Sequence, residues 1–136
     1  MYLLDTNVVS EFRHARPNRS VVRWVESILP QDLHVSAVTI GEIQAGIEIT
    51  REQDTAKALE IEAWLNGIPD TFILISADSD VFKVWAQLMH RQSDRLIMDA
   101  LIAATAIVNS LTVVSRNVRD FQQLGVPVFN PFDHPA

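Results

Sequence analysis

Short apolar runs alternate along the chain with longer segments in which apolar residues recur every three or four positions. The short runs are typical of strands covered on both faces, and the longer segments are typical of helices. Five strands are predicted, over residues 2–4, 34–38, 72–75, 111–114 and 126–129. The predicted helices cover residues 6–12, 21–29, 55–66, 77–91, 98–110 and 117–124, with another from Thr39 onward. Strands that alternate with helices predict an α/β fold with a mostly parallel sheet.

Hydroxyl and amide side chains predict where two of these helices begin. Thr6 or Asn7 can cap the first short helix, because each side chain can accept a hydrogen bond from a free backbone N–H. Thr39 and Glu42 fit the capping-box pattern Thr-x-x-Glu at the start of a later helix. No repeat, linker or low-complexity stretch interrupts the chain, so we expect one domain over residues 1–136.

Composition excludes several classes of protein. The chain has no cysteine, so neither a disulfide framework nor a cysteine nucleophile can form. No basic leader precedes the first strand, and no apolar run reaches the ~20 residues of a membrane helix. We therefore expect a cytoplasmic protein that has no contact with a membrane.

The net charge of −6 argues against binding nucleic acid through bulk electrostatic attraction. Positive charge is nevertheless concentrated near the N-terminus, where four arginines fall within eleven residues: Arg13, Arg16, Arg19 and Arg23. Arginine offers a planar fork to phosphate and to carboxylate groups. This cluster could contact such a group locally, or it could simply be a solvated helix surface.

Acidic residues stand where the predicted strands give way to helices. Asp5 closes the first strand, and Glu42 lies in the first helical turn after the second. Asp99 lies in the first turn of an alanine-rich helix, and Asp120 follows the fourth strand. Ligands of an open parallel sheet bind outside the carboxyl ends of its strands. Three of these positions should therefore converge if the first, second and fourth strands are neighbours.

Such a cluster predicts metal-assisted chemistry. Carboxylates held close together repel one another, and their pKa values rise unless a cation intervenes. Hard oxygen ligands select Mg²⁺ or Mn²⁺, which take phosphate oxygens as further ligands. The sequence therefore favours hydrolysis of a phosphodiester, in which the metal generates hydroxide and stabilises the leaving oxygen.

Each acidic residue also has a purely structural alternative. Asp5 could do no more than cap the short helix, and the side chain of Glu42 could be fully engaged in its capping box. Asp99 suits the positive end of a helix dipole, although a carboxylate among apolar residues needs a partner. Asp120 could cap a helix or point into water.

Two other kinds of small α/β protein with a magnesium pocket do not fit. A phosphoacceptor receiver domain needs an aspartate that closes the third strand, which here ends in Ile75-Ser76, and a lysine after the last, whereas no lysine follows Lys83. A phosphatase of the haloacid-dehalogenase type needs a second aspartate two residues after the first, where this chain has Asn7.

Four blocks of the sequence resemble those of the PIN-domain nucleases. They are residues 3–11, 36–46, 99–106 and 113–121, and residues 128–131 are also similar. The blocks cover essentially the whole chain in the order and spacing of the family. The resemblance is nearest to the VapC/FitB-like toxins of bacterial type II toxin–antitoxin pairs. It implies a PIN-like three-layer fold, in which helices flank a mostly parallel sheet of about five strands.

The resemblance also implies a Mg²⁺- or Mn²⁺-dependent endoribonuclease that is inhibited by a cognate antitoxin. It implies a homodimer or a higher toxin–antitoxin assembly, in which DNA is bound only through the antitoxin. By position, Asp5, Glu42 and Asp99 match the acidic triad of the family. The fourth acid of relatives falls at Asn117 or Asp120, so either Asp120 completes the site or Asn117 contributes a neutral oxygen.

Three further residues are expected to support this site. Thr6 and Ser115 match hydroxylic positions near the metal, and Arg116 would attract the RNA backbone. In the mechanism that we hypothesise, Asp5 and Asp99 bind the metal directly, and hydroxide attacks the phosphate in line.

The remaining acid, Glu42, binds the metal directly or through water, and Asp120 or Asn117 steadies the nucleophilic water. The amide at Asn117 also leaves an alternative, a catalytically inactive PIN-like module that only engages a partner protein or RNA.

The three tryptophans lie at apolar spacing on predicted helices, which favours core packing or a subunit interface over base stacking. They are Trp24, Trp64 and Trp85. The helix of Trp24 and the helix over residues 55–66 could form an antiparallel pair. Its exposed apolar side could then receive a segment of the antitoxin.

Overall fold

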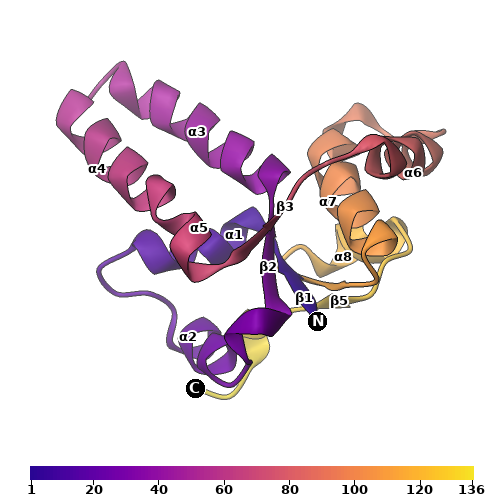
Figure 1. Cartoon of the computed structure of the whole chain (residues 1–136), viewed down its shortest axis with the longest axis horizontal. Helices are drawn as coiled ribbons and strands as arrows, with labels where there is room; N and C mark the ends of the chain where they lie inside the picture. The colour runs from indigo at the N-terminus through magenta and orange to yellow at the C-terminus, as the bar shows by residue number, and fades with distance from the viewer.

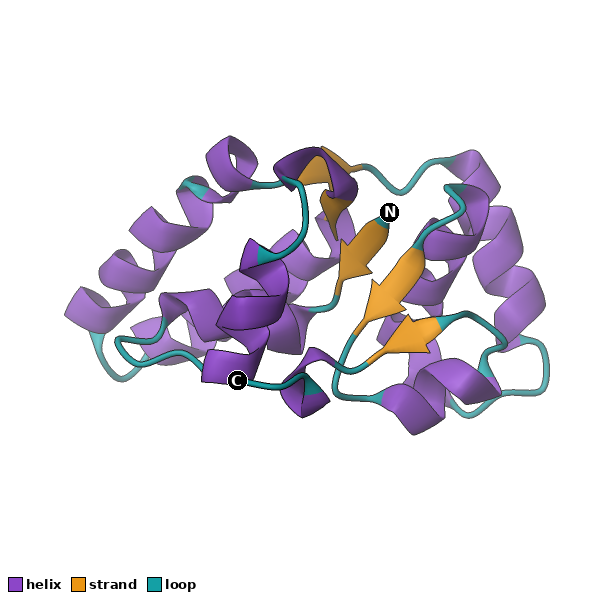
Figure 2. Ribbon diagram, turned by 90° about the horizontal axis from the view of Figure 1, so that it is seen from below, coloured by secondary structure: helices purple, strands orange, loops and turns teal.

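Five short parallel strands run through the middle of the molecule, and helices cover both faces of the sheet (Figures 1 and 2). The computed structural model describes residues 1–136. Its strands are β1 (Tyr2–Leu4), β2 (Leu33–Ser36), β3 (Ile73–Ile75), β4 (Thr112–Val114) and β5 (Val128–Phe129). They lie in the order β3-β2-β1-β4-β5, so the first, second and fourth strands are neighbours. The expected α/β fold with a parallel sheet is confirmed.

Eight α-helices connect and flank these strands. They are α1 (Thr6–Val9), α2 (Arg19–Glu26), α3 (Ala37–Arg51), α4 (Thr55–Asn66), α5 (Ile68–Thr71), α6 (Ser79–Met89), α7 (Ile97–Val108) and α8 (Val118–Gln123). Short 3₁₀ turns cover Ser10–Arg13, Pro30–Asp32, Asp94–Leu96 and Pro131–Asp133. Figure 1 places α1 to α5 on one side of the sheet and α6 to α8 on the other. None of the helices combines the length and the apolar character needed to cross a membrane.

The two faces of the central strands form two separate hydrophobic cores. Leu4 of β1 and Val114 of β4 pack with α1 to α5, whereas Leu3 and Val113 pack beneath α7 and α8. Successive side chains of a strand point to opposite faces of a sheet. Because helices cover both faces, these strands are mostly apolar on both sides, which explains the apolar runs in the sequence.

The junction between β2 and α3 differs from the prediction. Ala37 and Val38, predicted as strand, are the first residues of α3. The Ser36 hydroxyl accepts the N–H of Val38 at 3.0 Å and caps this helix, so Thr39 and Glu42 do not form a capping box. A short run of apolar residues suits a strand or a helix equally well, and the serine cap decides between them here.

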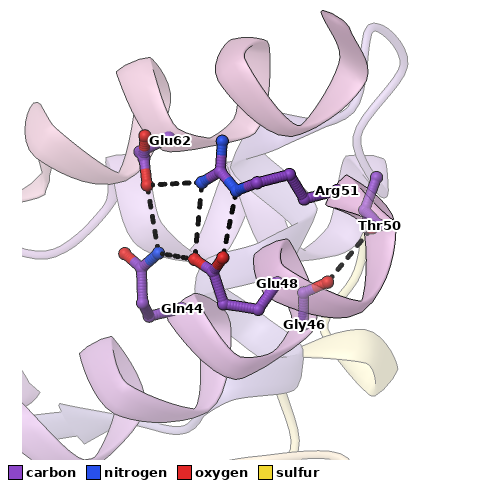
Figure 3. Close-up of polar contacts among 6 residues, drawn as sticks. All are labelled: Gln44, Gly46, Glu48, Thr50, Arg51 and Glu62. Atoms are coloured by element: carbon purple, nitrogen blue, oxygen red, sulfur yellow. Dashed lines mark hydrogen bonds and ion pairs between the residues drawn. The ribbon is translucent and has the colours of Figure 1, made fainter. Parts of the chain in front are cut away.

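The helix α4 packs mainly against α3, so the predicted pairing of α4 with α2 is wrong. A short turn joins α3 to α4, and such turns make the two helices antiparallel neighbours. Arg51 of α3 donates to Glu48 on its own helix at 3.0 Å and to Glu62 of α4 at 2.9 Å. Gln44 donates to both of these acids (Figure 3). This polar network holds the two helices side by side.

The tryptophans differ in their surroundings. Trp24 is buried between Tyr2 and Phe129, which confirms core packing for this residue. Trp64 and Trp85 are only partly buried, and the Trp85 indole N–H donates to the Ile97 carbonyl at 3.1 Å. On α4, Leu59 points outward with 56% of its surface exposed.

Candidate active site

Asp5 lies at the carboxyl end of β1 and is only 4% exposed. Its N–H extends the sheet by donating to the Val114 carbonyl at 2.9 Å. One carboxylate oxygen accepts the N–H of Thr6 at 2.8 Å, and the other accepts the Ser115 hydroxyl at 2.8 Å. Asp5, rather than Thr6 or Asn7, is therefore the N-cap of α1. The same side chain is also held against the end of β4.

Asn7 connects the ends of β1 and β4, a role that sequence reasoning missed. Its amide nitrogen donates to the Ser115 hydroxyl at 3.1 Å and to the second oxygen of Asp5 at 3.3 Å. Its amide oxygen accepts the N–H of Arg116 at 3.2 Å. The available signal was its position two residues after the aspartate that closes the first strand.

Thr6 fixes the carboxylate of Glu42 from the neighbouring element. The Thr6 hydroxyl donates to Oε1 of Glu42 at 2.8 Å, and the buried Thr39 hydroxyl lies 3.1 Å from the same Thr6 oxygen. Glu42 is half-buried in the second turn of α3, not in the first turn as predicted. Since Glu42 takes part in no capping box, its carboxylate can contact a ligand that binds beside Asp5.

Asp99 lies in the first turn of α7 and is half-buried. Burial raises the pKa of Asp99 from its ordinary value of 3.8 to about 6, with further increases from the negative charges of Asp5, Asp120 and Glu42. The Arg95 guanidinium opposes this shift. Four acids from four segments of the chain therefore share one electrostatic environment at the carboxyl edge of the sheet.

The pKa values of the other two members of the predicted triad, Asp5 and Glu42, are also raised. Burial is the main cause that raises the pKa of Asp5, and hydrogen bonds from Ser115 and Thr6 oppose it. Burial also raises the pKa of Glu42, where the Thr6 hydroxyl opposes the shift and repulsion by Asp5 adds to it. These carboxylates are thus crowded and partly desolvated, as expected from the sequence.

The structure brings Asp120 into this environment, and Asn117 contributes its backbone N–H to it. Asp120 accepts a hydrogen bond from Arg95 at 3.1 Å, and its charge acts on Asp99. Asn117 is exposed, and its backbone N–H donates to the Ser115 hydroxyl at 2.9 Å. Its side chain makes no capping hydrogen bond to α8. Arg95 was not identified from the sequence, since 25 residues separate it from Asp120.

Arg116 is anchored beside the acids, but its charged end lies elsewhere. Its N–H bonds Asn7, whereas its guanidinium lies 3.7 Å above the centre of the Phe132 ring. This cation–π contact holds the positive charge against the C-terminal 3₁₀ turn. Reaching a phosphate at the acidic edge would therefore require the side chain to leave Phe132.

The acidic residues fit a hard divalent cation in charge and in donor type. They offer only oxygen donors, which Mg²⁺ and Mn²⁺ prefer, and their raised pKa values signal an uncompensated negative charge. No group of three or more of these acids is positioned to hold a metal ion in this structure. Ser115, Asn7 and Thr6 orient two of the carboxylates, as groups around a metal site do for its ligands.

The chain is similar in sequence to a known protein family and to individual proteins along nearly its whole length. Residues 2–127 match the family described as PIN domain. Toxin FitB of Neisseria gonorrhoeae is 33% identical over 138 residues, which covers 97% of this chain and 99% of that protein. A VapC ribonuclease of Sinorhizobium fredii is 30% identical over 141 residues, covering 98% of this chain and 99% of the relative.

Solved structures agree with these matches. The crystal structure of FitAcB from Neisseria gonorrhoeae has a TM-score of 0.85 at 33% identity, covering 98% of this chain and 99% of the other. A toxin–antitoxin complex from Klebsiella pneumoniae has a TM-score of 0.66 at 27% identity, covering 96% and 98% of the two chains.

The raised pKa of Asp99 predicts how stability depends on pH. Because protonated Asp99 is favoured in the folded state, its contribution to stability is full below pH 3.8 and is lost as the pH rises through about 6. With chelator present, the free energy of unfolding should fall over this window, and Asp99→Asn should flatten the fall. Urea unfolding at a series of pH values tests this, with carboxyl ¹³C NMR to follow Asp99 directly.

The matched control is Asp94→Asn, because Asp94 is exposed in the neighbouring 3₁₀ turn. This variant should keep the pH dependence of the wild type. An Asp99 carboxyl that titrates near 4, together with equal slopes for all three proteins, would contradict the electrostatic description of the site.

Proposed function

Because this chain belongs to the PIN-domain family, we propose that it is a metal-dependent endoribonuclease and the toxin of a toxin–antitoxin pair. The observation that carries the proposal is the meeting of four acids at one edge of the sheet. They are Asp5, Glu42, Asp99 and Asp120. The names of the FitB and VapC relatives support a toxin and a ribonuclease.

In this proposal, Asp5, Glu42 and Asp99 hold one or more Mg²⁺ or Mn²⁺ ions. Such an ion supplies a Lewis acid for the phosphate and lowers the pKa of water to near neutrality. Protonation of Asp99 competes with metal binding as the pH falls toward its pKa of about 6. Ser115 and Thr6 keep Asp5 and Glu42 oriented through hydrogen bonds of 2.8 Å each.

We assign the fourth acidic position to Asp120. Its carboxylate acts on Asp99 and is steadied by Arg95, so it is placed to orient a water molecule near the phosphate. Asn117 contributes its backbone N–H to Ser115, which supports the site without a charge. The amide at this position therefore removes no carboxylate from the cluster, and the catalytically inactive binding module is the less favoured function.

We propose that the antitoxin occupies an apolar groove on the face of α1 to α5. The groove has a volume of about 630 Å³ and lies between the chain after α2 and the helices α4 and α5. Phe12, Val25, Ile28, Trp64 and Phe72 line it. An amphipathic segment of a partner can bury its apolar face in such a groove. The Klebsiella pneumoniae toxin–antitoxin complex supports a protein partner for this fold.

The homodimer stays a prediction, and we propose that β3 and α6 contribute to it. Ile73 and Leu74 expose 45% and 40% of their surface on the edge strand, and Phe82 of α6 exposes 46%. Exposed apolar side chains on neighbouring elements favour contact with a second chain.

Asp99→Asn should reduce RNA cleavage by more than about one-hundredfold, because lost outer partners of metal ligands already cost up to about one-hundredfold. Purified protein is incubated with total bacterial RNA and Mg²⁺, Mn²⁺ or chelator, and new 5′ ends are sequenced. Asp94→Asn serves as the control and should cut at the same ends as the wild type. Identical ends from the wild type and Asp99→Asn would contradict the assignment, and absent Mn²⁺ binding would favour the inactive module.

The two candidates for the fourth position give different outcomes. Asp120→Asn should lower kcat at least about tenfold, in line with the loss of a group that positions a reactant. It should also lower the pKa of Asp99, because one repelling charge is removed. Asn117→Ala should change both quantities little. The assignment is wrong if Asn117→Ala has the larger effect on cleavage.

The groove is tested by a pair of adjacent residues. Ile28 lines the groove, whereas Leu29 is 59% exposed outside it. Ile28→Glu should weaken antitoxin binding more than about tenfold, because the complex would bury an unpaired charge. Leu29→Glu should bind as the wild type does. The probe is the small protein encoded beside this chain, co-expressed and measured by calorimetry, and equal affinities for both variants would contradict the proposed groove.

A further inference from the structure

A second, smaller cavity begins at the acidic edge itself. It has a volume of about 260 Å³ and lies between the N-terminal segment of the chain and the helices α3 and α4. Thr6 and Glu42 form part of its wall, so it is continuous with the candidate active site. A group bound in this cavity would therefore lie directly beside whatever occupies the acidic cluster.

The walls of this cavity combine apolar surface with a few polar groups. Ile61 and Trp64 of α4 face Gly46 and the buried Ile47 of α3, and Thr50 adds a hydroxyl. A nucleobase has two apolar faces and a polar edge, and bases that leave a stack bind to surfaces of this kind. The volume lies below the roughly 300–1,000 Å³ of pockets for drug-sized ligands. The volume therefore suits a small planar group such as a single base.

The charge around the cavity also suits RNA. Arg13 is its one basic lining residue, and it is exposed and takes part in no ion pair within the chain. Glu42 lies in the same wall and belongs to the acidic cluster. A ribose-phosphate backbone that runs from the acidic edge past the cavity would find a guanidinium for its next phosphate.

Gly46 is an exposed residue of α3 that lines the cavity and carries no side chain. A Cβ atom added at this position would meet no atom within 4 Å, so a larger side chain has room there. The Gly46 carbonyl accepts the Thr50 hydroxyl at 3.1 Å, and the network around Arg51 holds α3 against α4 on the next turn (Figure 3). The two walls are thus fixed relative to each other.

We propose that this cavity, the flanking-base pocket, receives the single nucleobase next to the scissile phosphate and so determines where RNA is cut. The inference rests on the proposed endoribonuclease activity and extends it to substrate selection. Arg13 binds the adjoining phosphate, and Ile61 and Trp64 contact the base. Selection at one nucleotide follows from the size of the pocket.

The test fills the pocket through Gly46. Gly46→Leu adds a side chain at a position that lines the cavity and where a Cβ meets no atom within 4 Å, and leucine favours a helix more than glycine does. Gly46→Ala fills it partly, which gives a graded series. Ala45→Leu is the matched control, because Ala45 is the adjacent exposed residue of α3 and lines neither cavity.

The substrate is a short RNA that spans a mapped cleavage site. It is compared with two abasic versions of the same RNA, each of which lacks one of the two bases that flank the cleaved phosphate. The wild type and Ala45→Leu should have a kcat/KM roughly ten- to one-hundredfold higher for the intact RNA than for one of the abasic RNAs. Gly46→Leu should cut the two equally, at the lower rate. A full preference retained by Gly46→Leu would overturn the flanking-base pocket while leaving the nuclease intact.

A binding measurement separates failure of the pocket from failure of the activity. If no RNA is cut in an Asp99-dependent manner, the proposed function fails, and the pocket is judged by binding alone. The four ribonucleoside 5′-monophosphates are titrated in the presence of chelator and followed by NMR at the Ile61 methyls and the Trp64 indole. Shifts that Gly46→Leu abolishes support the pocket, whereas unchanged signals overturn it.

Discussion

The burial of Asp5 is the constraint on which the rest of the site depends. Its carboxylate is almost fully removed from water, so each of its oxygens needs a donor. Those donors come from α1 and from the end of β4, through Thr6, Ser115 and Asn7. The same bonds that satisfy Asp5 therefore hold the ends of the two central strands in register, and they orient the carboxylate toward the other acids.

Around Asp5, the acids at the carboxyl edge of the sheet destabilise the fold. Asp99 has a pKa of about 6 because it is half-buried near three other acids, and only Arg95 relieves the repulsion. Like charges in a partly desolvated space destabilise the metal-free fold, and a cation would remove that cost. The cost is understandable only if the cluster serves a function, and this is the physical basis for assigning it a catalytic one.

The helix α4 borders two surfaces with different chemistry. The larger groove is mainly apolar and includes none of the four clustered acids, whereas the smaller cavity opens beside Glu42. Trp64 lines both of them. The network of Arg51 with Glu48 and Glu62 fixes the spacing of the two helices, and hence the width of the smaller cavity (Figure 3). The helix α4 thus contributes to both the proposed partner surface and the proposed substrate pocket.

The sequence by itself determined the order of strands and helices and the positions of Asp5, Glu42 and Asp99, because hydrophobic period and strand-end location are local properties. It placed the start of α3 two residues too late, at Thr39, since apolar residues such as Ala37 and Val38 suit a strand or a helix. Only the tertiary structure decided that α4 packs on α3, that Asn7 joins two strand ends, and that Asp120 reaches Asp99 with Arg95. Those contacts depend on how distant segments pack against one another, and no local pattern records that.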